Sequence, residues 1–219
     1  MGDSIAGPAR GAETAQTLDR GLWLLHHVAD APAGLTVTEI AQRLGVGRAV
    51  VYRLAATLIE HSMIRRDPTG RLRLGAGVLH LATRAQPLIV GAARPILRRL
   101  AEQVGATAHL TVADGGEATA LAVVEPTWTA MHVAYRPGTH HPLDRGAAGK
   151  AIAEGRRGNP GWVATSGELQ SGAHGIAAPV LGVDGLEASI GVISLTPLDP
   201  DTVGPQVLTA AQSLTTALH

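Results

Sequence analysis

The stretch "LTVTEIAQRLGVGRAVVYRL", residues 35–54, decides how the N-terminal part of the chain folds. Thr36 or Thr38 can cap a short helix. The apolar positions on one face of that helix are Ile40, Ala41 and Leu44. Gly45 stands where a left-handed C-cap is favoured, and a second helix is expected from about residue 47 to residue 61. A short helix, a three-residue break with glycine and a longer helix are typical of a helix-turn-helix.

The flanking segments extend this pattern to a winged helix-turn-helix. A first helix is expected to begin near Thr17 as its N-cap and to end at "DAPAG", where Pro32 and Gly34 break it. Its expected apolar face consists of Leu18, Leu22, Leu25 and Val28. Downstream, "MIRRDPTGRLRLG" predicts a hairpin with strands 63–66 and 71–74 around the turn 67–70.

The outward face of the second helix is the candidate DNA-binding surface. Its inner stripe, expected to pack on the first helix of the motif, is Val51, Leu54, Ala55 and Leu58. The positions left outside are Arg48, Ala49, Tyr52 and Arg53. Arginine can bind guanine edges or phosphates, tyrosine can contact the sugar-phosphate backbone, and alanine permits close approach. The wing adds four arginines, namely Arg65, Arg66, Arg71 and Arg73. Arginines on a solvated helix face are also common, so this alternative stays open.

Composition supports a local contact with a polyanion. The formal net charge is zero, yet residues 35–84 carry eight arginines against three acids, a net charge of +5. The chain has no cysteine, which excludes disulfides, thiolate catalysis and cysteine-based metal sites. It has neither a run of eighteen apolar residues nor a signal-peptide pattern, so we expect a soluble cytoplasmic protein without a membrane partner.

The rest of the chain predicts an α+β domain. A helix over 78–85 leading to Pro87 and a further helix over about 89–103 come first. Asp114-Gly115-Gly116 and Asp184-Gly185 indicate two hairpins, and "TAMHVAY" (129–135) predicts a further strand. "GAAGKAIAEG" (146–155) predicts a short helix of small residues, and 199–218 a C-terminal helix. The expected organisation is a disordered tail (1–15), the winged helix-turn-helix (16–76), a linker helix (77–86) and an effector-binding domain (87–219).

Taken in order, these motifs resemble the IclR-type transcriptional regulators. "LTVTEIAQRLGVGRAVVYRLAATLIEHSMIRRDPTGRLRLGAGVLHLA" resembles their DNA-binding domain, with its "EIA..LG" helix, its "YRL..TL" recognition helix and a wing running into "RLG". "ARPILRRLAEQVGATAHLTVADGGE", "HPLDRGAAGKAIAEG" and "GELQSGAHGIAAPVLGVDGLEASIGVISL" resemble their effector-binding domain. The resemblance implies a GAF-like fold with an antiparallel sheet for the C-terminal domain.

Two departures from the family pattern affect the expected sites. A Ser or Thr near the start of the family's recognition helix usually holds a phosphate, but Ala49 and Val50 stand here. Anchoring must then depend on Arg48 and on backbone N–H groups at the helix N-terminus. Relatives also carry a longer helical segment where this chain has only residues 156–160, so the effector domain is shortened.

The resemblance places a ligand cavity between the sheet and the helix of small residues. It implicates Ala130, Val133, Ala147, Ala148, Gly149, Thr165 and Gly175. Strand alternation adds Ser194 and Thr196 as a hydroxyl-bearing floor, although such hydroxyls can equally bond the backbone or face water. N–H groups at the helix start can receive a carboxylate, so a carboxylate or an aromatic molecule is expected as effector.

Other classes of function have weaker support in the sequence. Ser166, His174 and Asp184 lie in no nucleophile-elbow pattern, so we expect neither catalysis nor a cofactor. A metal-responsive regulator would need histidines such as His26, His27, His132, His140 and His141, which lack a typical ligand spacing. We expect no metal, although this alternative and that of a ligand-free DNA-binding protein stay open.

The sequence therefore predicts a ligand-responsive transcriptional regulator, and a repressor in particular. It is expected to recognise a pseudo-palindromic operator as a homodimer or a dimer of dimers, because one recognition helix buries too little surface for operator-level specificity.

Overall fold

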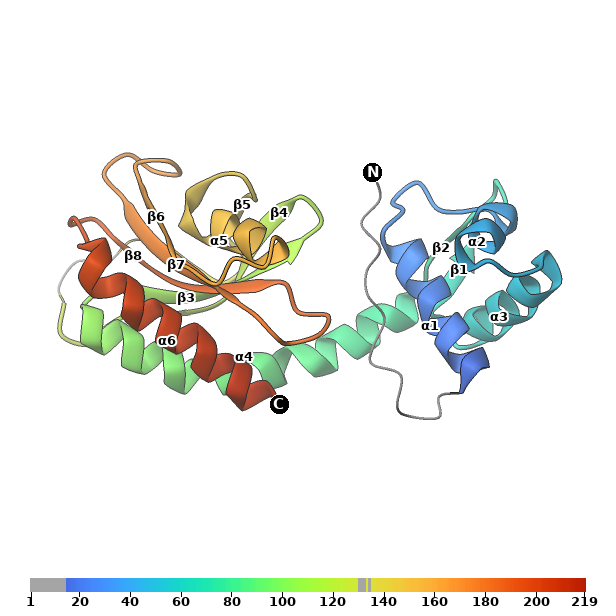
Figure 1. Cartoon of the computed structure of the whole chain (residues 1–219), viewed down its shortest axis with the longest axis horizontal. Helices are drawn as coiled ribbons and strands as arrows, with labels where there is room; N and C mark the ends of the chain where they lie inside the picture. The colour runs from blue at the N-terminus through green and yellow to red at the C-terminus, as the bar shows by residue number, and fades with distance from the viewer. Residues whose placement is uncertain (1–14, 130–132, 134) are drawn as a thin grey trace. The chain divides into compact units, whose positions relative to one another are not determined.

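The computed structural model describes residues 15–129, 133 and 135–219, and its contacts divide the chain into two units (Figure 1). These are Met1–Ala85 and Gln86–His219. The expected tail, 1–15, falls almost entirely outside the described residues. Each unit is described separately below.

The N-terminal unit is the predicted winged helix-turn-helix. Its elements are α1 (Gln16–Ala29), α2 (Val37–Leu44), α3 (Arg48–Glu60), β1 (Ile64–Arg66) and β2 (Leu72–Leu74). The two strands pair antiparallel, and Gly70 takes a φ of 82° in the predicted turn. Leu35 and Leu72 exchange two backbone hydrogen bonds, of 3.0 and 2.7 Å, which attach the wing to the segment before α2.

Helix α2 begins and ends as the sequence predicts. The Thr36 hydroxyl accepts a hydrogen bond from the N–H of Glu39, and the Glu39 carboxylate accepts one from the N–H of Thr36. This capping box satisfies two backbone donors at the helix start. Gly45 closes the helix with a φ of 63°, a conformation that glycine adopts without steric cost. Of the two expected caps, Thr36 is the one used, and Thr38 is exposed.

Helix α1 buries only part of the predicted face, because Val28 is buried and Leu25 is partly buried against the core, whereas Leu18 and Leu22 are exposed. Gly21, Leu24 and Val28 are buried against the core of the unit, whereas Leu18 and Leu22 are 63% and 49% exposed. The N-cap is Ala15, without a side-chain hydrogen bond, so the prediction of Thr17 as cap was wrong. Helical periodicity identifies a stripe of leucines, but the packing of α2 and α3 decides which side of α1 is covered.

The two helices predicted around Pro87 are one helix, α4 (Ala76–Val104), with Pro87 and Pro95 inside it. Proline removes one backbone hydrogen bond and crowds the residue four positions before it. All side chains from 81 to 88 are exposed, so solvent can satisfy the carbonyl that Pro87 leaves free. The residue that Pro95 crowds is Gly91, four positions before it, and the space around Gly91 is open. Both prolines therefore fit inside one helix, and the prediction of a break was wrong.

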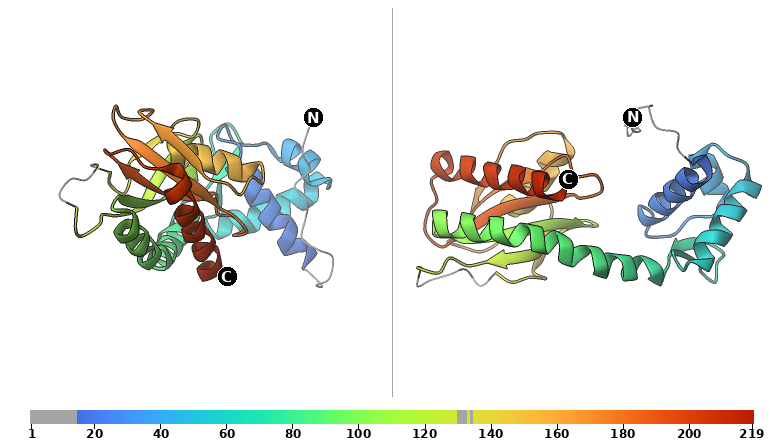
Figure 2. Two further views of the ribbon diagram at one scale, coloured as in Figure 1. Left: turned by 60° about the vertical axis from the view of Figure 1, so that its left-hand side comes forward. Right: turned by 90° about the horizontal axis from the view of Figure 1, so that it is seen from below.

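The C-terminal unit is an antiparallel sheet with helices on both faces (Figures 1 and 2). The strand order is β5-β4-β3-β8-β7-β6. The strands are β3 (Thr107–Asp114), β4 (Glu117–Val124), β5 (His140–Pro142), β6 (Val163–Ser166), β7 (His174–Val180) and β8 (Ala188–Ser194). Helix α5 (Gly146–Arg156) covers one face, and α6 (Pro200–Leu218) with the second half of α4 covers the other.

Both predicted hairpins, the helix of small residues and the C-terminal helix are confirmed. The predicted strand at 129–135 falls largely outside the described residues, and Val133 and Tyr135 are not in a strand. The edge strand beside β4 is β5 instead, which pairs His141 with Ala118. Within the described residues, no helix is both long and apolar enough to cross a membrane.

The capping box gives a test of the fold of the N-terminal unit. We expect Thr36→Ala to lower the free energy of unfolding of this unit by about 1 kcal/mol, because one backbone donor of α2 loses its partner. Thr38→Ala, two residues away and exposed, is the matched control and is expected to change it by less than about 0.5 kcal/mol. Urea denaturation measures both. Equal effects of the two substitutions would contradict the assignment of the cap.

Candidate nucleic-acid interface and ligand pocket

The outward face of α3 is the one predicted from the sequence. Val51, Leu54 and Ala55 are buried in the core of the unit. Arg48, Ala49, Tyr52 and Arg53 are exposed on the other side. Among the described residues, no carboxylate lies within ion-pair distance of Arg48 or Arg53. Both guanidinium groups are therefore available to an external anion.

The start of α3 is also open to an anion. Its N-cap is Gly47, which offers no side chain to the backbone donors of the first turn, and that turn holds no acidic residue. Gly47, Arg48 and Ala49 are exposed. Unsatisfied N–H groups at a helix N-terminus attract phosphate through hydrogen bonding and the helix dipole. This geometry fits the expected anchoring by Arg48 and backbone in place of a hydroxyl.

The four wing arginines divide into two structural groups. Arg71 donates to the Glu39 carboxylate at 2.9 Å and to the carbonyl of Gly34. Arg73 donates to Asp67 at 2.8 Å and to the carbonyl of Pro32. These two side chains connect the wing to the loop before α2 and to its own turn.

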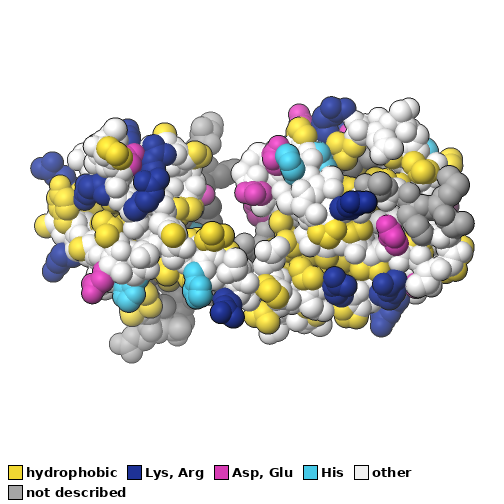
Figure 3. All heavy atoms as spheres, turned by 180° about the vertical axis from the view of Figure 1, so that it is seen from behind, with side chains coloured by type: hydrophobic (Ala, Val, Ile, Leu, Met, Phe, Trp, Pro, Cys, Tyr) yellow, Lys and Arg dark blue, Asp and Glu magenta, His cyan; other side chains and the backbone are white. Residues whose placement is uncertain are grey.

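Arg65 and Arg66, by contrast, are exposed. Arg66 reaches only the carbonyl of Gly70 at the wing tip, and Arg65 makes no ion pair with any described carboxylate. Figure 3 shows several arginine side chains gathered on the surface of the N-terminal unit. Of the wing residues, Arg65 and Arg66 are the ones placed to contact a ligand.

Asp67 organises the turn of the wing. Its carboxylate accepts hydrogen bonds from the Thr69 hydroxyl, from Arg73 and from two backbone N–H groups. The hydroxyl of Thr69 and the guanidinium of Arg73 hold the pKa of this carboxyl well below its usual value. Asp67 is therefore ionised at neutral pH and neutralises Arg73 within the wing.

The C-terminal unit contains a small pocket between the sheet and the start of α5. Its volume is about 30 Å³. Of the predicted effector residues, Ala147, Ala148, Thr165 and Gly175 line it. A Cβ on Gly175 would lie 3.3 Å from the Cβ of Ala147, so small residues on both sides keep the space open.

The remaining predicted effector residues lie elsewhere. Gly149 is buried on α5, where a Cβ would come within 2.6 Å of the Leu143 carbonyl oxygen. Val133 packs with Ala120 and Tyr135 in a separate small cluster. Ala130 lies outside the described residues.

Ser194 and Thr196 are not among the residues that line the pocket. Their hydroxyls hydrogen-bond each other at 2.9 Å. Ser194 lies on the same face of β8 as Ile190 and Val192, which belong to the core formed with α4 and α6. It therefore projects toward the face of the sheet opposite α5.

Glu168 occupies the N-terminus of α5. Its carboxylate accepts hydrogen bonds from the N–H of Gly146 at 2.9 Å and from Nζ of Lys150 at 2.6 Å. These two bonds lower the pKa of Glu168, the one from Lys150 contributing most. Arg145, the N-cap residue, donates to the backbone carbonyl of Glu168. The protein's own carboxylate thus engages the N–H of Gly146, which precedes the N–H groups that the sequence suggested for a ligand carboxylate.

A buried polar cluster forms the opposite wall of the pocket. Nδ1 of His109 lies 3.0 Å from Oγ1 of Thr111, and the rings of His109 and Tyr135 meet edge to face at 5.2 Å. Gly191 makes room for this cluster, because a Cβ there would lie 2.8 Å from Cε1 of His109. Burial, and secondarily the neighbouring His141, lower the pKa of His109 to about 3, so its ring is neutral at physiological pH.

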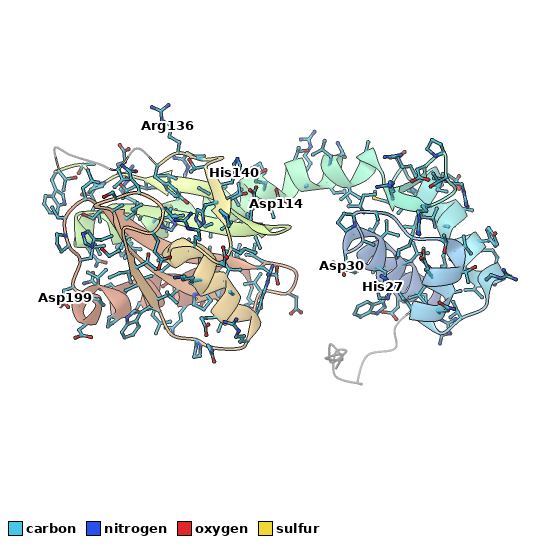
Figure 4. The ribbon with its side chains drawn as sticks, turned by 90° about the horizontal axis from the view of Figure 1, so that it is seen from above. His27, Asp30, Asp114, Arg136, His140 and Asp199 are labelled. Atoms are coloured by element: carbon cyan, nitrogen blue, oxygen red, sulfur yellow. The ribbon has the colours of Figure 1, made fainter. Side chains whose placement is uncertain are left out.

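His140 and His141 are adjacent on β5 and face opposite ways. His140 is exposed (Figure 4), and its Nδ1 lies 3.0 Å from the Glu117 carboxylate at the sheet edge. His141 is buried and lines the pocket. The described residues contain no group of three potential metal ligands, and His132 lies outside them. His26 and His27 lie beside the ring of Trp23 on α1, and Asp30 is the C-cap residue of this helix (Figure 4).

The three residues weighed for catalysis do not form a triad. Ser166 and His174 are cross-strand partners on β6 and β7. Asp184 follows the far end of β7, because His174 is the first residue of that strand and Val180 the last.

Comparison with known protein families gives two matches in chain order. The IclR helix-turn-helix domain matches residues 17–68, and the bacterial transcriptional regulator IclR C-terminal domain matches residues 82–158. The chain belongs to the IclR family. This is a family of transcriptional regulators, not of enzymes. The IclR C-terminal match ends at residue 158, within the segment that the sequence indicated as shortened.

Curated IclR-family relatives are similar over about two thirds of this chain. The HTH-type transcriptional regulator BhcR of Paracoccus denitrificans is 34% identical over 63% of this chain and 50% of its own length. The transcriptional repressor IclR of Escherichia coli is 31% identical over 66% of this chain and 54% of its own length. The acetate operon repressor of Salmonella typhimurium is 30% identical over 63% of this chain and 52% of its own length. The chain thus spans about half the length of the curated relatives that it matches.

Solved structures of IclR-type proteins share the fold over nearly the whole chain. The IclR of Thermotoga maritima has a TM-score of 0.52 at 17% identity, covering 93% of this chain and 98% of its own. An IclR homolog from Microbacterium hydrocarbonoxydans, complexed with 4-hydroxybenzoate, has a TM-score of 0.53 at 17% identity. The match covers 92% of this chain and 98% of the homolog.

Four polar residues that line the pocket were not predicted as effector residues from the sequence, namely His109, Tyr135, His141 and Glu168. His109 alternates with Leu110 along β3, and that alternation places it on the α5 face of the sheet. Glu168 lies in the "GELQSG" motif that carries part of the resemblance to the IclR family, and this signal could have identified it. Nothing local predicts Tyr135 or His141, because tertiary packing brings them to the pocket.

The low pKa of His109 predicts an acid-sensitive C-terminal unit. Between the unfolded pKa of 6.5 and the folded pKa of about 3, the unfolded chain binds a proton that the folded chain does not. Stability from this residue is therefore lost as the pH falls below 6.5, by about 2 kcal/mol at pH 5.

We expect His109→Gln to remove this part of the pH dependence, and His140→Gln, on an exposed residue, to leave it in place. Urea denaturation at pH 7.5 and pH 5, followed by the fluorescence of Trp128 and Trp162 in a Trp23→Phe background, measures the difference. If the wild type and His109→Gln lost the same free energy of unfolding between pH 7.5 and pH 5, the assignment to His109 would be contradicted.

Proposed function

We propose that this IclR-family chain is a DNA-binding transcriptional repressor. It recognises a pseudo-palindromic operator as a homodimer and responds to a small organic molecule bound in the C-terminal unit. Repression is the activity named for the relatives from Escherichia coli and Salmonella typhimurium.

The observation that carries the proposal is the unneutralised cationic face of α3. Arg48 and Arg53 point to solvent beside Tyr52 and an uncapped helix start, and Arg65 and Arg66 extend the same charge on the wing. In a helix-turn-helix, the outward face of the second helix enters the major groove. Arginine there can read guanine bidentately, while the helix start and the wing hold phosphates.

Substitution of Arg53 tests the interface. We expect Arg53→Ala to weaken binding to a selected duplex at least tenfold, since a base or phosphate contact worth about 1–3 kcal/mol is lost. If Arg53 contacts a phosphate, the plot of log affinity against log salt concentration also becomes less steep, by about one unit of slope. Fluorescence anisotropy at several salt concentrations, with a duplex enriched from a random-sequence pool, measures both quantities.

Arg94→Ala is the matched control, because Arg94 is an exposed arginine on α4 in the C-terminal unit. It is expected to leave both affinity and salt dependence unchanged. Unaltered binding by Arg53→Ala, or an equal loss with Arg94→Ala, would refute the recognition-helix assignment.

Dimerisation rests on apolar side chains that the N-terminal unit leaves exposed. Leu18 and Leu22 lie one helical turn apart on α1, and Leu79 and Leu81 are 67% and 55% exposed on α4. A two-fold symmetric contact would cover the face of α1 that carries Leu18 and Leu22 with the same face of a second copy. It would also present two recognition helices to two half-sites.

We expect Leu22→Glu to shift the chain toward the monomer, because a carboxylate would be buried in the contact. Gln16→Glu adds the same charge at the exposed first residue of α1 and serves as control. Sedimentation velocity over a concentration series measures the dissociation constant, with a change of at least about tenfold expected for Leu22→Glu. Identical behaviour of both variants would refute this contact.

The pocket beside α5 supports the response to a small molecule. It lies in the unit that resembles the effector-binding domain, and a structural neighbour of that fold is complexed with 4-hydroxybenzoate. A ligand there regulates DNA binding only if it binds two arrangements of the dimer with different affinity.

A further inference from the structure

Two arginines of the wing stand directly opposite each other. Arg65 on β1 and Arg73 on β2 are register partners, so their side chains leave the same face of the hairpin. Leu72, the residue before Arg73, is fully buried, and alternation along β2 therefore places both arginines on the face opposite Leu72. Like charges at directly opposite positions repel. The wing must accommodate a second cation beside the exposed Arg65.

Asp67 neutralises this second cation. Its Oδ2 accepts a hydrogen bond from Nε of Arg73 at 2.8 Å, and the carbonyl oxygen of Pro32 accepts one from Nη1 of the same guanidinium at 2.6 Å. The Asp67 side chain is only 7% exposed, so salt screens this pair less than it would screen a pair on the surface. A phosphate that approached Arg73 would also approach the carboxylate of Asp67, and the pair offers it no net charge.

The two carboxylate oxygens of Asp67 have separate roles. Oδ1 accepts from the N–H groups of Thr69 and Arg71 and from the Thr69 hydroxyl, whereas Oδ2 accepts from Arg73. The bonds to Oδ1 shape the turn, and the oxygen of an asparagine amide can accept the same bonds in turns of this kind. An amide nitrogen in place of Oδ2 can only donate and cannot hold Arg73. The turn therefore needs one acceptor, and only Arg73 needs the negative charge.

An unpaired Arg73 would change how strongly the wing binds any DNA. Each phosphate that a basic side chain neutralises raises the affinity independently of sequence and steepens its dependence on salt. Arg73 lies beside Arg65, one of the two wing residues placed to contact a ligand, so its release would add one such contact in each chain. Because non-operator DNA competes with the operator in vast excess, additional contacts of this kind hold a regulator at the wrong sites.

We propose that Asp67 keeps Arg73 away from DNA phosphates and thereby limits the sequence-independent affinity of the wing for DNA. Asp67 is a positioning residue that acts through Arg73, and the phosphate contacts of the wing come from Arg65 and Arg66. This inference rests on the proposed DNA binding and adds a limit to its strength.

Neutral substitutions of the two partners test the proposal. Asp67→Asn keeps the acceptor of the turn and frees Arg73, whereas Asp67→Asn combined with Arg73→Met replaces both partners and keeps the net charge of the wild type. Glu60→Gln is the matched control, because it also removes one negative charge, at an exposed residue of α3 that pairs with no arginine in the described part of the chain. Fluorescence anisotropy with the full chain and an unrelated duplex measures the affinity between about 50 and 200 mM salt.

We expect Asp67→Asn to tighten binding to the unrelated duplex at least about threefold at about 100 mM salt. The plot of log affinity against log salt concentration is expected to become steeper, by about one unit of slope for each chain bound. The double substitution is expected to bind like the wild type, since neither offers a free guanidinium at position 73. Glu60→Gln is expected to change the affinity less than about twofold and to leave the slope unchanged.

Three results would overturn the proposal. The first is a gain with Asp67→Asn that persists in the double substitution, because Arg73 would then not be the group that binds phosphate. The second is an unchanged or weaker affinity of a folded Asp67→Asn, as judged by circular dichroism. The third is an equal gain with Glu60→Gln, which would assign the effect to net charge alone.

Arg73→Met alone keeps the proposal testable even where Asp67→Asn does not fold, because it leaves every bond of the turn to Asp67 in place. Its slope is expected to equal that of the wild type. A slope less steep by about one unit for each chain bound would show that Arg73 already contacts phosphate, which contradicts the proposal. A wild type that binds DNA, with no effect of Asp67→Asn, refutes only this inference, whereas a wild type that binds no duplex refutes the proposed function.

Discussion

Glu39 joins two elements that a DNA-binding surface needs in a fixed relation. Its carboxylate accepts from the backbone N–H of Thr36, which fixes the start of α2, and from Arg71, which belongs to the wing. Because α3 packs on α2 through buried apolar residues, this carboxylate also relates the wing to the exposed face of α3. With Arg71 and Arg73 engaged internally, the positive charge that α3 and the wing offer to solvent comes from Arg48, Arg53, Arg65 and Arg66. The wing is thus both a basic surface and a hydrogen-bonded part of the core unit.

Glu168 has a comparable position in the C-terminal unit. It too lies at the start of a helix and accepts from a backbone N–H and a basic side chain. Here the carboxylate engages one backbone donor of α5, the N–H of Gly146, together with Nζ of Lys150. On one unit, the free helix start and unpaired arginines suit a polyanion. On the other, Glu168 already accepts from the first N–H of the helix, and the buried His109 beside the pocket is neutral.

Features set by local chemistry were predictable from the sequence. Residue type and short-range spacing predict a threonine cap at Thr36 or Thr38, the left-handed Gly45, the wing turn at Asp67 and the outward face of α3. Features set by distant packing were not. The buried side of α1, the engagement of Arg71 by Glu39, and the meeting of His141 with His109 depend on segments far apart in the chain. The continuity of α4 through Pro87 depends on exposure that periodicity does not report.

The pairing of Lys150 with Glu168 has a consequence for covalent control. Lys150 is the only lysine in the chain, and the candidate DNA-binding surface uses arginine alone. Lysine acetylation therefore has no target on that surface, whose charge also persists at any pH at which the protein folds. The only side-chain amine available to acylation lies beside the pocket, where loss of its charge would leave the Glu168 carboxylate without its ion-pair partner.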